Sequence, residues 1–276
     1  MVKMEQDYGG LFKALLAIRK ERPDASPMGP SGVLTTFQGG IGELPRTAAG
    51  RLGNRIRYNT TVAGVKRDEE GYIVTLDSGE CYRSRAVLLA TPANAAAQIT
   101  RELSPALSQA FAAIPYAGLA VICAGYDREQ VGHALDGFGF LAPRKQGLRL
   151  LGCLWTSSLF PFEAPEDHVL LRTMYGGAPD PQALTLSDHE LLACMEKELP
   201  PLLHIKGAPS LVKIYRHPGG IPQYTLGHEK RLRVIDEAEQ AMPGLAVAGN
   251  AYRGIGLNDC VVAAHHAVDK ILGHLR

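Results

Sequence analysis

The sequence carries almost no net charge and few aromatic side chains. Its 29 basic residues are balanced by 28 acidic ones, which leaves a formal charge of +1, and aromatic residues occupy 7% of the 276 positions. Proteins that hold a phosphate backbone use a surplus of Lys and Arg, often with aromatic platforms for the bases. The composition therefore argues against a nucleic-acid partner.

Paired cysteines and clustered histidines are also missing. The five cysteines are widely separated and form no CxxC pair, and the nine histidines show no HExxH spacing. A zinc site needs ligands at close, regular spacing, so we expect no bound metal. An odd number of scattered cysteines suits a reducing compartment, in which each thiol packs as a small apolar side chain.

No segment has the pattern of a membrane span or a secretion signal. A membrane helix requires roughly 20 apolar residues in succession, and neither such a run nor a signal peptide is present. With 46% hydrophobic and 21% charged residues, the composition is that of a globular protein. We expect a cytoplasmic protein, and contact with the inner face of the cell membrane is left open.

Familiar catalytic and nucleotide-binding motifs are absent as well. There is no GxSxG nucleophile elbow, no Walker loop and no complete GxGxxG. Reading GxGxxG from Gly40 places Pro45 where the third glycine belongs, which excludes the standard dinucleotide motif there. No side chain stands out as a general base, so no catalytic residue is named. These exclusions favour a cofactor that supplies its own reactivity.

The amino-terminal part is expected to contain two helices. Glu5–Arg22 has apolar residues at helical spacing, and Asp24–Gly32 is rich in Pro, Ser and Gly, as loops are. Val33–Phe37 is β-prone and stops at Gly39-Gly40-Ile41-Gly42. A helix is predicted next, over Glu43–Leu52.

Four short β-type runs follow, and the turn residues between them indicate a meander. The runs are Ile56–Tyr58, Val62–Arg67, Tyr72–Leu76 and Ala86–Ala90. The last run is apolar throughout, as expected of a strand that is covered on both faces. The alanine-rich Asn94–Ile99 is predicted to begin a helix.

The middle of the chain has the pattern of an antiparallel sheet with one inserted helix. The helix is predicted over Ser187–Leu199, with a capping box between Ser187 and Glu190, and another helix begins near Glu229. The strand candidates are Leu119–Gly125, Gly139–Leu141, Leu148–Trp155, Val169–Tyr175 and Leu211–Tyr215.

The tail returns to an apolar strand over Leu245–Ala248, a glycine turn and a helix over Cys260–Leu272. We interpret the fold as α/β of the α+β kind, with a cofactor-binding domain interrupted by an antiparallel-sheet domain. The expected divisions are 1–31 (a helix and loop leading from the substrate domain), 32–99 (a cofactor-domain segment), 100–235 (the substrate-binding domain) and 236–276 (the second cofactor-domain segment).

The strongest candidate site is the glycine turn between that last strand and helix, in Gly244–Asn250 and Gly254–Cys260. Unpaired N–H groups at the start of a helix, and the positive end of its dipole, favour an anionic or electron-rich ligand. Gly254 and Gly256 allow such a ligand to approach the backbone closely. A plain strand-to-helix turn explains the same spacing equally well.

Two further positions are weaker candidates. Gly39 and Gly40 lie between a predicted strand and helix, where a plain helix-entry turn is at least as good an explanation. Tyr224, in the loop Ile221–His228, could stack on a ring system. A buried tyrosine with a local hydrogen bond is the more common arrangement.

At these residues the sequence resembles the protoporphyrinogen oxidase family, FAD-dependent flavoproteins of the monoamine-oxidase-like superfamily. The most specific motifs are Ile221–His228 and Ala248–Cys260 (AGNAYRGIGLNDC). Weaker matches extend the resemblance along nearly the whole chain, at Met4–Leu11, Phe37–Pro45, Leu88–Ala93 and Leu151–Pro161.

The resemblance implies an FAD site. Ile255, Gly256 and Leu257 match positions whose backbone touches the isoalloxazine in the family. Gly249 and Asn250 match the strand end near the pyrophosphate and ribityl chain. The complete set of cofactor-binding residues that we expect adds Gly254, Gly39, Gly40, Tyr224 and Val62, which matches a valine whose backbone contacts the adenine.

The implied activity is the six-electron oxidation of a porphyrinogen to the porphyrin in haem biosynthesis, by hydride transfer to FAD and reoxidation by O2. The substrate, protoporphyrinogen IX or coproporphyrinogen III, needs an apolar cavity and a basic residue for its propionates. The sequence does not choose among Arg128, Arg144, Arg149 and Arg172 for that role.

The main departure from the family is the lack of the βαβ unit with GxGxxG, which binds the ADP part of FAD. We therefore expect a fragment or one half of a split enzyme, completed by an amino-terminal half or by a homodimer. On its own the chain is expected to be inactive and to bind FAD poorly. Two alternatives stay open: another flavin oxidoreductase of the superfamily, such as an amine oxidase or a carotenoid desaturase, and a non-catalytic fragment that binds a tetrapyrrole or a partner chain.

Overall fold

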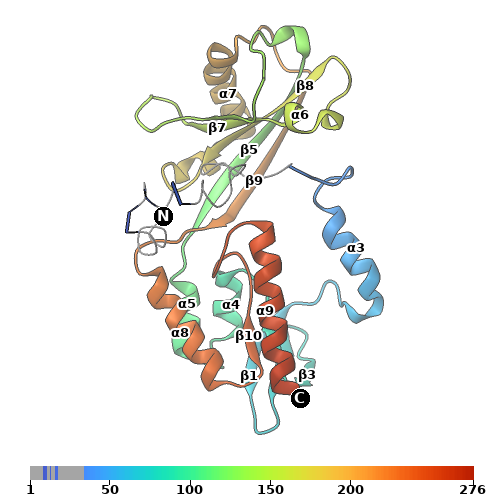
Figure 1. Ribbon diagram of the computed structural model, residues 1–276, viewed down its shortest axis with the longest axis vertical. Helices are drawn as coiled ribbons and strands as arrows, with labels where there is room; N and C mark the ends of the chain where they lie inside the picture. Colours follow the sequence, from blue (N-terminus) through green and yellow to red (C-terminus); the bar gives the residue numbers. More distant parts are fainter. Residues whose placement is uncertain (1–8, 11–12, 14–15, 18–33) are drawn as a thin grey trace.

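The computed structural model describes residues 9–10, 13, 16–17 and 34–276. Five residues of the predicted helix Glu5–Arg22 are described: Lys13, Leu16 and Ala17 are helical, whereas Gly9 and Gly10 form a bend and are not. The rest of that prediction and the predicted loop Asp24–Gly32 lie outside the described residues. The fold combines helices and sheets, as predicted. Figure 1 shows two groups of elements, one above the other, which two long strands connect.

The upper group is built on a five-stranded antiparallel sheet in the order β6-β7-β8-β5-β9. Its core lies between one face of the sheet and helix α7 (Asp188–Leu203), where Ile122, Leu171 and Met195 are completely buried. The predicted strands are confirmed. They are β5 (Tyr116–Asp127), β6 (Gly139–Leu141), β7 (Leu150–Trp155), β8 (His168–Gly176) and β9 (Leu211–Pro222).

The lower group surrounds two parallel strands, β4 (Val87–Leu89) and β10 (Leu245–Val247). Alternate side chains of these strands point to opposite faces. On one face Ala246 packs against α9 (Leu257–Leu275), and on the other Leu245 joins a core cluster with the remaining helices. These helices are α4 (Ala93–Ile99), α5 (Pro105–Ala112) and α8 (His228–Ala241).

A three-stranded antiparallel meander packs against the same core cluster. It consists of β1 (Val62–Arg67), β2 (Tyr72–Leu76) and β3 (Cys81–Ser84). The expectation of a four-run meander was wrong in two places. Ile56–Tyr58 is not a strand, and the run at Ala86–Ala90 leaves the meander to pair with β10.

Helix α3 (Glu43–Leu52) has the bounds predicted for it, and it stands apart from both groups in Figure 1. None of its residues is buried. Residues 34–37 before it are not a strand, so the predicted strand Val33–Phe37 is wrong over its described part. The short elements are α6 (Thr156–Leu159), η1 (Gly53–Arg55), η2 (Arg128–Gln130), η3 (Pro161–Glu163) and η4 (Pro181–Thr185).

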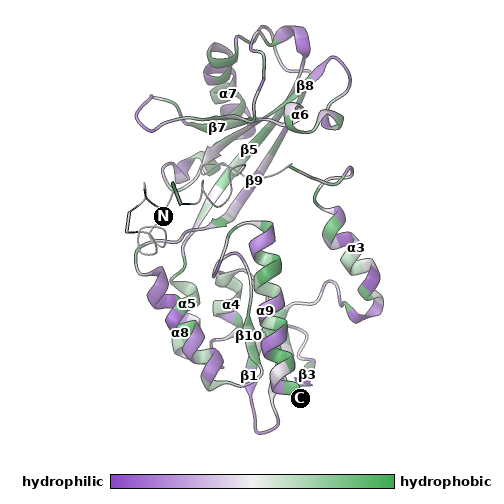
Figure 2. Ribbon diagram, in the orientation of Figure 1, coloured by the Kyte–Doolittle hydropathy of each residue, from purple (hydrophilic) through white to green (hydrophobic). Residues whose placement is uncertain are grey.

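Helix α9 is the longest helix of the described region, and it begins three residues before the predicted start at Cys260. Figure 2 shows hydrophobic and hydrophilic residues alternating along it. Within residues 34–276, no helix is both long and apolar enough to cross a bilayer.

Candidate functional site

The carboxyl ends of β4 and β10 lie side by side, because Val247 is in register with Leu89. In open α/β sheets, ligands bind outside this edge. Gly249 and Asn250 continue β10 beyond the edge, and Thr91 continues β4. The Thr91 hydroxyl oxygen is buried and has no hydrogen-bond partner among the described residues. The edge therefore offers an unused hydrogen-bonding group.

A glycine turn leads from this edge into α9. Gly254 has a φ of 72°, which glycine adopts without strain, and a Cβ there would overlap the side chain of Asp259. The Asp259 carboxylate accepts a hydrogen bond from the Gly256 N–H at 3.2 Å. The side chains of Ile255 and Leu257 are left 66% and 50% exposed. The turn thus presents backbone and apolar side chains outward, as contact with a flat ring requires.

The loop before α8 reaches the same turn. The Tyr224 hydroxyl donates a hydrogen bond to the Asn250 carbonyl at 2.8 Å, and the Tyr224 ring stacks on the His228 imidazole at 4.1 Å. Burial raises the pKa of Tyr224, and the nearby thiol of Cys260 and carboxylate of Asp259 raise it further. The two most specific motifs of the sequence are therefore in contact.

Two polar atoms beneath the turn are buried without a partner in the part of the chain that the structure describes. They are the Tyr252 hydroxyl and the His228 Nδ1. Burial raises the pKa of Tyr252, and its hydroxyl can donate a hydrogen bond. The other ring nitrogen of His228, Nε2, lies 3.3 Å from the Tyr252 carbonyl.

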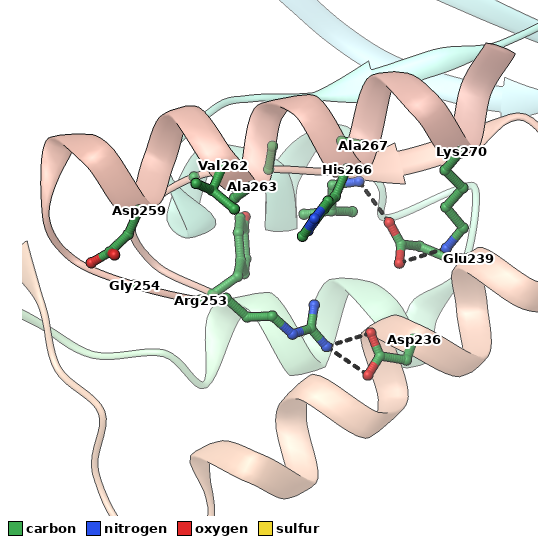
Figure 3. Close-up of a pocket in the computed structure, with 14 residues that line it drawn as sticks. Asp236, Glu239, Arg253, Gly254, Asp259, Val262, Ala263, His266, Ala267 and Lys270 are labelled. Carbon is green, nitrogen blue, oxygen red and sulfur yellow. Dashed lines mark hydrogen bonds and ion pairs between the residues drawn. The ribbon is translucent and has the colours of Figure 1, made fainter. Parts of the chain in front are cut away.

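A cavity of about 650 Å³ lies between α8 and α9, next to β10 (Figure 3). Two ion pairs stand in its wall: Arg253 with Asp236 at 2.6 Å, and Lys270 with Glu239 at 2.9 Å. Gly249 and Gly254 are the predicted cofactor residues that line it. Ile255–Leu257 are not in its lining, so the cavity and the outward face of the glycine turn are different surfaces.

Glu239 connects three elements at this cavity. It lies on α8 and is 9% exposed. One carboxylate oxygen accepts the N–H of Val247 in β10 at 2.7 Å, and the other accepts a hydrogen bond from Lys270 in α9. Sequence reasoning missed Glu239 and Asp236. The sequence signal that could have found them is their spacing of three residues, which places both on one face of a helix. That signal is weak, because such pairs are common on solvated helices.

The other predicted cofactor residues lie apart from the turn. Val62 begins β1 and packs against the core cluster of the lower group, the cluster that contains Leu245 and Tyr252. Gly39 and Gly40 form the turn that starts α3, where the Gly39 N–H donates to the Glu43 carboxylate at 3.0 Å. Helix α3 does not pack on the lower group in Figure 1, so the described residues do not bring Gly39 and Gly40 to α9.

A sequence model of the family described as flavin containing amine oxidoreductase matches residues 4–272. The chloroplastic protoporphyrinogen oxidase of Nicotiana tabacum is 30% identical over 286 residues, which cover 97% of this chain and 52% of the relative. The coproporphyrinogen III oxidase of Bacillus subtilis (strain 168) is 28% identical over 267 residues, covering 95% and 56%.

A solved structure is also similar to the chain. The crystal structure of a protein assigned as a protoporphyrinogen oxidase from Exiguobacterium sp. 255-15 matches with a TM-score of 0.78 and 26% identity. The match covers 98% of this chain and 57% of that protein. The chain therefore spans about half the length of the relatives that it matches.

Proposed function

Because the chain belongs to the flavin containing amine oxidoreductase family, we propose that it carries the isoalloxazine side of an FAD site in a porphyrinogen oxidase. One observation carries the proposal. Tyr224 and Asn250, from the two motifs most specific to porphyrinogen oxidases, are joined by a hydrogen bond of 2.8 Å beside the glycine turn.

The reaction that we propose is the oxidation of protoporphyrinogen IX or coproporphyrinogen III to the porphyrin in haem biosynthesis, with O2 as the final electron acceptor. Relatives named for each of these two substrates match at least 95% of the chain. Their similarity supports the substrate class and does not choose between its two members.

The roles that we propose for the residues are those that the family resemblance implies, and the geometry of the glycine turn supports them. Ile255, Gly256 and Leu257 face outward at the start of α9, where backbone N–H groups and exposed apolar side chains suit one face of a flavin ring. When bound, the flavin supplies the hydride acceptor. Gly249 and Asn250, at the strand edge, would contact the pyrophosphate and the ribityl chain. Val62 would contact the adenine.

We propose that a βαβ unit holds the ADP part of FAD and adds a parallel strand to β4. Within residues 34–276, β4 has a neighbour on one side only, and that neighbour is β10. The far edge of β10 is closed by Glu239, which occupies the Val247 N–H. Sheets of parallel strands usually have more than two members and are covered on both faces, so the edge of β4 is the place for a further strand.

The division into cofactor segments 32–99 and 236–276 around a substrate domain at 100–235 stays a proposal. Helices α5 and α8, at the two limits of that middle region, contribute Phe111 and Ile235 to the lower core cluster. The part of the middle region that we assign to the substrate is therefore the sheet β5–β9.

Gly254→Ala tests the cofactor site. We expect it to lower FAD affinity and porphyrinogen turnover at least tenfold in the complete enzyme, because alanine at a φ of 72° overlaps Asp259 and displaces the turn. Gly273→Ala in the same helix is the matched control, since a Cβ there meets no atom within 4 Å.

The measurements are flavin fluorescence for binding and porphyrin fluorescence in air for turnover. Failure of the unmodified, FAD-loaded enzyme to oxidise either porphyrinogen would contradict the proposed substrate. Undiminished FAD binding by Gly254→Ala would contradict the proposed cofactor site.

A further inference from the structure

The face of the five-stranded sheet that is turned away from α7 is largely apolar, and the described residues cover it only in part. Figure 1 shows α7 above this sheet and the amino-terminal end of α9 below it. Side chains that alternate with the buried residues of β5, β7, β8 and β9 make up this face, which we name the open face. Its apolar members include Val121, Leu154, Leu170, Met174, Leu211 and Tyr215.

One transverse row of the open face carries two cations. Cys123 of β5 is in register with Arg172 of β8 on one side and with Lys213 of β9 on the other. Residues in register share a face, so both cations flank Cys123 on the open face. With neighbouring strands about 4.8 Å apart, their Cα atoms are roughly 9–10 Å apart.

These two cations are not neutralised by the described residues. The open face has one carboxylate on its described strands, Asp127 at the far end of β5, and it pairs with His168 at 3.1 Å. Cations on the opposite face are paired, as Arg216 is with Asp188. An apolar surface with two unpaired cations suits a ligand that has an apolar body and carboxylates.

Four arginines were candidates for binding the propionates. The surroundings of the other three leave Arg172 as the best placed of them. Arg128 donates three hydrogen bonds to backbone carbonyls of residues 131–134, at 2.6–3.3 Å. Arg149 forms two hydrogen bonds with the Asp180 carboxylate, at 2.8 and 3.0 Å. Arg144 is exposed in the connection between β6 and β7, off the sheet.

The apolar and basic parts of the open face are ordered along the strands. Strand β5 starts near the lower group and passes Val121 before it reaches Cys123. Val121 is in register with Met174 and Tyr215, which form an apolar row on the side of the lower group. A flat ring over this row has one edge toward α9 and the opposite edge toward the two cations.

We propose that Arg172 and Lys213 bind two carboxylates of the tetrapyrrole substrate, whose ring lies over Val121, Met174 and Tyr215. The inference rests on the proposed porphyrinogen oxidase function and deepens it, because it assigns the propionate site to two residues. The proposed site also disfavours an amine substrate, because two cations with no carboxylate partner among the described residues repel a third positive charge.

The test is a titration of the chain with coproporphyrin III and with its tetramethyl ester. Trp155 on β7 is the only tryptophan of the sequence, so quenching of its fluorescence reports a porphyrin bound near this sheet. We expect Arg172→Met and Lys213→Met each to raise the Kd of the acid about tenfold, equivalent to about 1.4 kcal/mol. The Kd of the ester should change less than twofold.

Two matched variants complete the design. Arg172→Lys keeps the charge and should recover most of the lost affinity, which separates a charge effect from damage to the sheet. Lys197→Met removes an exposed cation from α7, behind the sheet, and should leave both Kd values unchanged.

The outcomes distinguish an error in the carboxylate site from an error in the proposed function. Unchanged affinity of both methionine variants for the acid would overturn the carboxylate site and leave the proposed function standing. Failure of the unmodified chain to bind either acid or ester would overturn the proposed function together with the site.

Discussion

At the scale of single residues, the site is held together by contacts between residues that lie far apart in the sequence. The hydrogen bond from Tyr224 to Asn250 joins residues 26 positions apart, and no local pattern predicts that they meet. The glycines of the turn were recognisable because a strand, a glycine pair and a helix follow one another directly. Glu239 was not, since its role comes from a backbone N–H that belongs to another element.

Glu239→Ala should destabilise the chain by about 2 kcal/mol, because a buried N–H without an acceptor costs about 1–3 kcal/mol. The change also leaves Lys270 without its partner, but that side chain is 43% exposed and its ion pair adds little. Glu239→Gln keeps a carbonyl oxygen for Val247 and should cost less than about 1 kcal/mol. Urea unfolding gives both values, with Glu237→Ala on the exposed side of α8 as the control.

Equal destabilisation by Glu239→Ala and Glu239→Gln would show that the charge, rather than the acceptor for Val247, carries the effect.

At the scale of elements, capping and periodicity predicted most helices, and pairing explains the errors. β3 was missed because Cys-Tyr-Arg-Ser has no apolar alternation, and it exists through its register with β2, where Thr75 faces Cys81. Ile56–Tyr58 has β-prone residues, but β1 pairs with β2 instead. Helix α5 was missed although Ser104 before Pro105 is a regular start signal, and the Ser104 hydroxyl accepts the Leu107 N–H at 3.3 Å.

The predicted capping box of α7 is confirmed and gives a prediction for this helix. The Ser187 hydroxyl accepts the Glu190 N–H at 3.2 Å, and the Glu190 carboxylate accepts the Ser187 N–H at 2.8 Å. Ser187→Ala should cost about 1 kcal/mol in the free energy of unfolding. Ser187→Asp, which caps equally well, should stay within about 0.5 kcal/mol of the original chain in the same thermal unfolding experiment.

If Ser187→Asp lost as much stability as Ser187→Ala, the cap would not be the source of the loss.

At the scale of the whole molecule, α9 has an apolar flank that the described elements leave uncovered. Ala267 and Ile271 pack on the parallel strands. One residue along a helix is a rotation of 100°, so His266 and Val268 lie on opposite flanks of Ala267. His266 lines the cavity next to β10, and the other flank therefore faces the side of β4. Leu257, Val261, Val268 and Leu272 on that flank are 43–50% exposed.

The open edge of β4 and the apolar flank of α9 thus lie on the same side of the lower group. A βαβ unit that adds its strand to β4 brings its helix beside α9, which covers both surfaces at once. This coincidence could not be read from the sequence, because it requires knowing that β10 lies on the other side of β4.

Val268→Glu should weaken binding of a separately produced amino-terminal βαβ unit from a porphyrinogen oxidase relative at least tenfold, since it places a charge in an apolar contact. Val262→Glu is the matched control: its side chain is 54% exposed but lines the cavity on the opposite flank, so binding should change less than twofold. Isothermal titration measures both. Sedimentation of the chain alone separates the alternative, because a dimer that Val268→Glu dissociates, without binding of the βαβ unit, would assign the flank to a second copy of the chain.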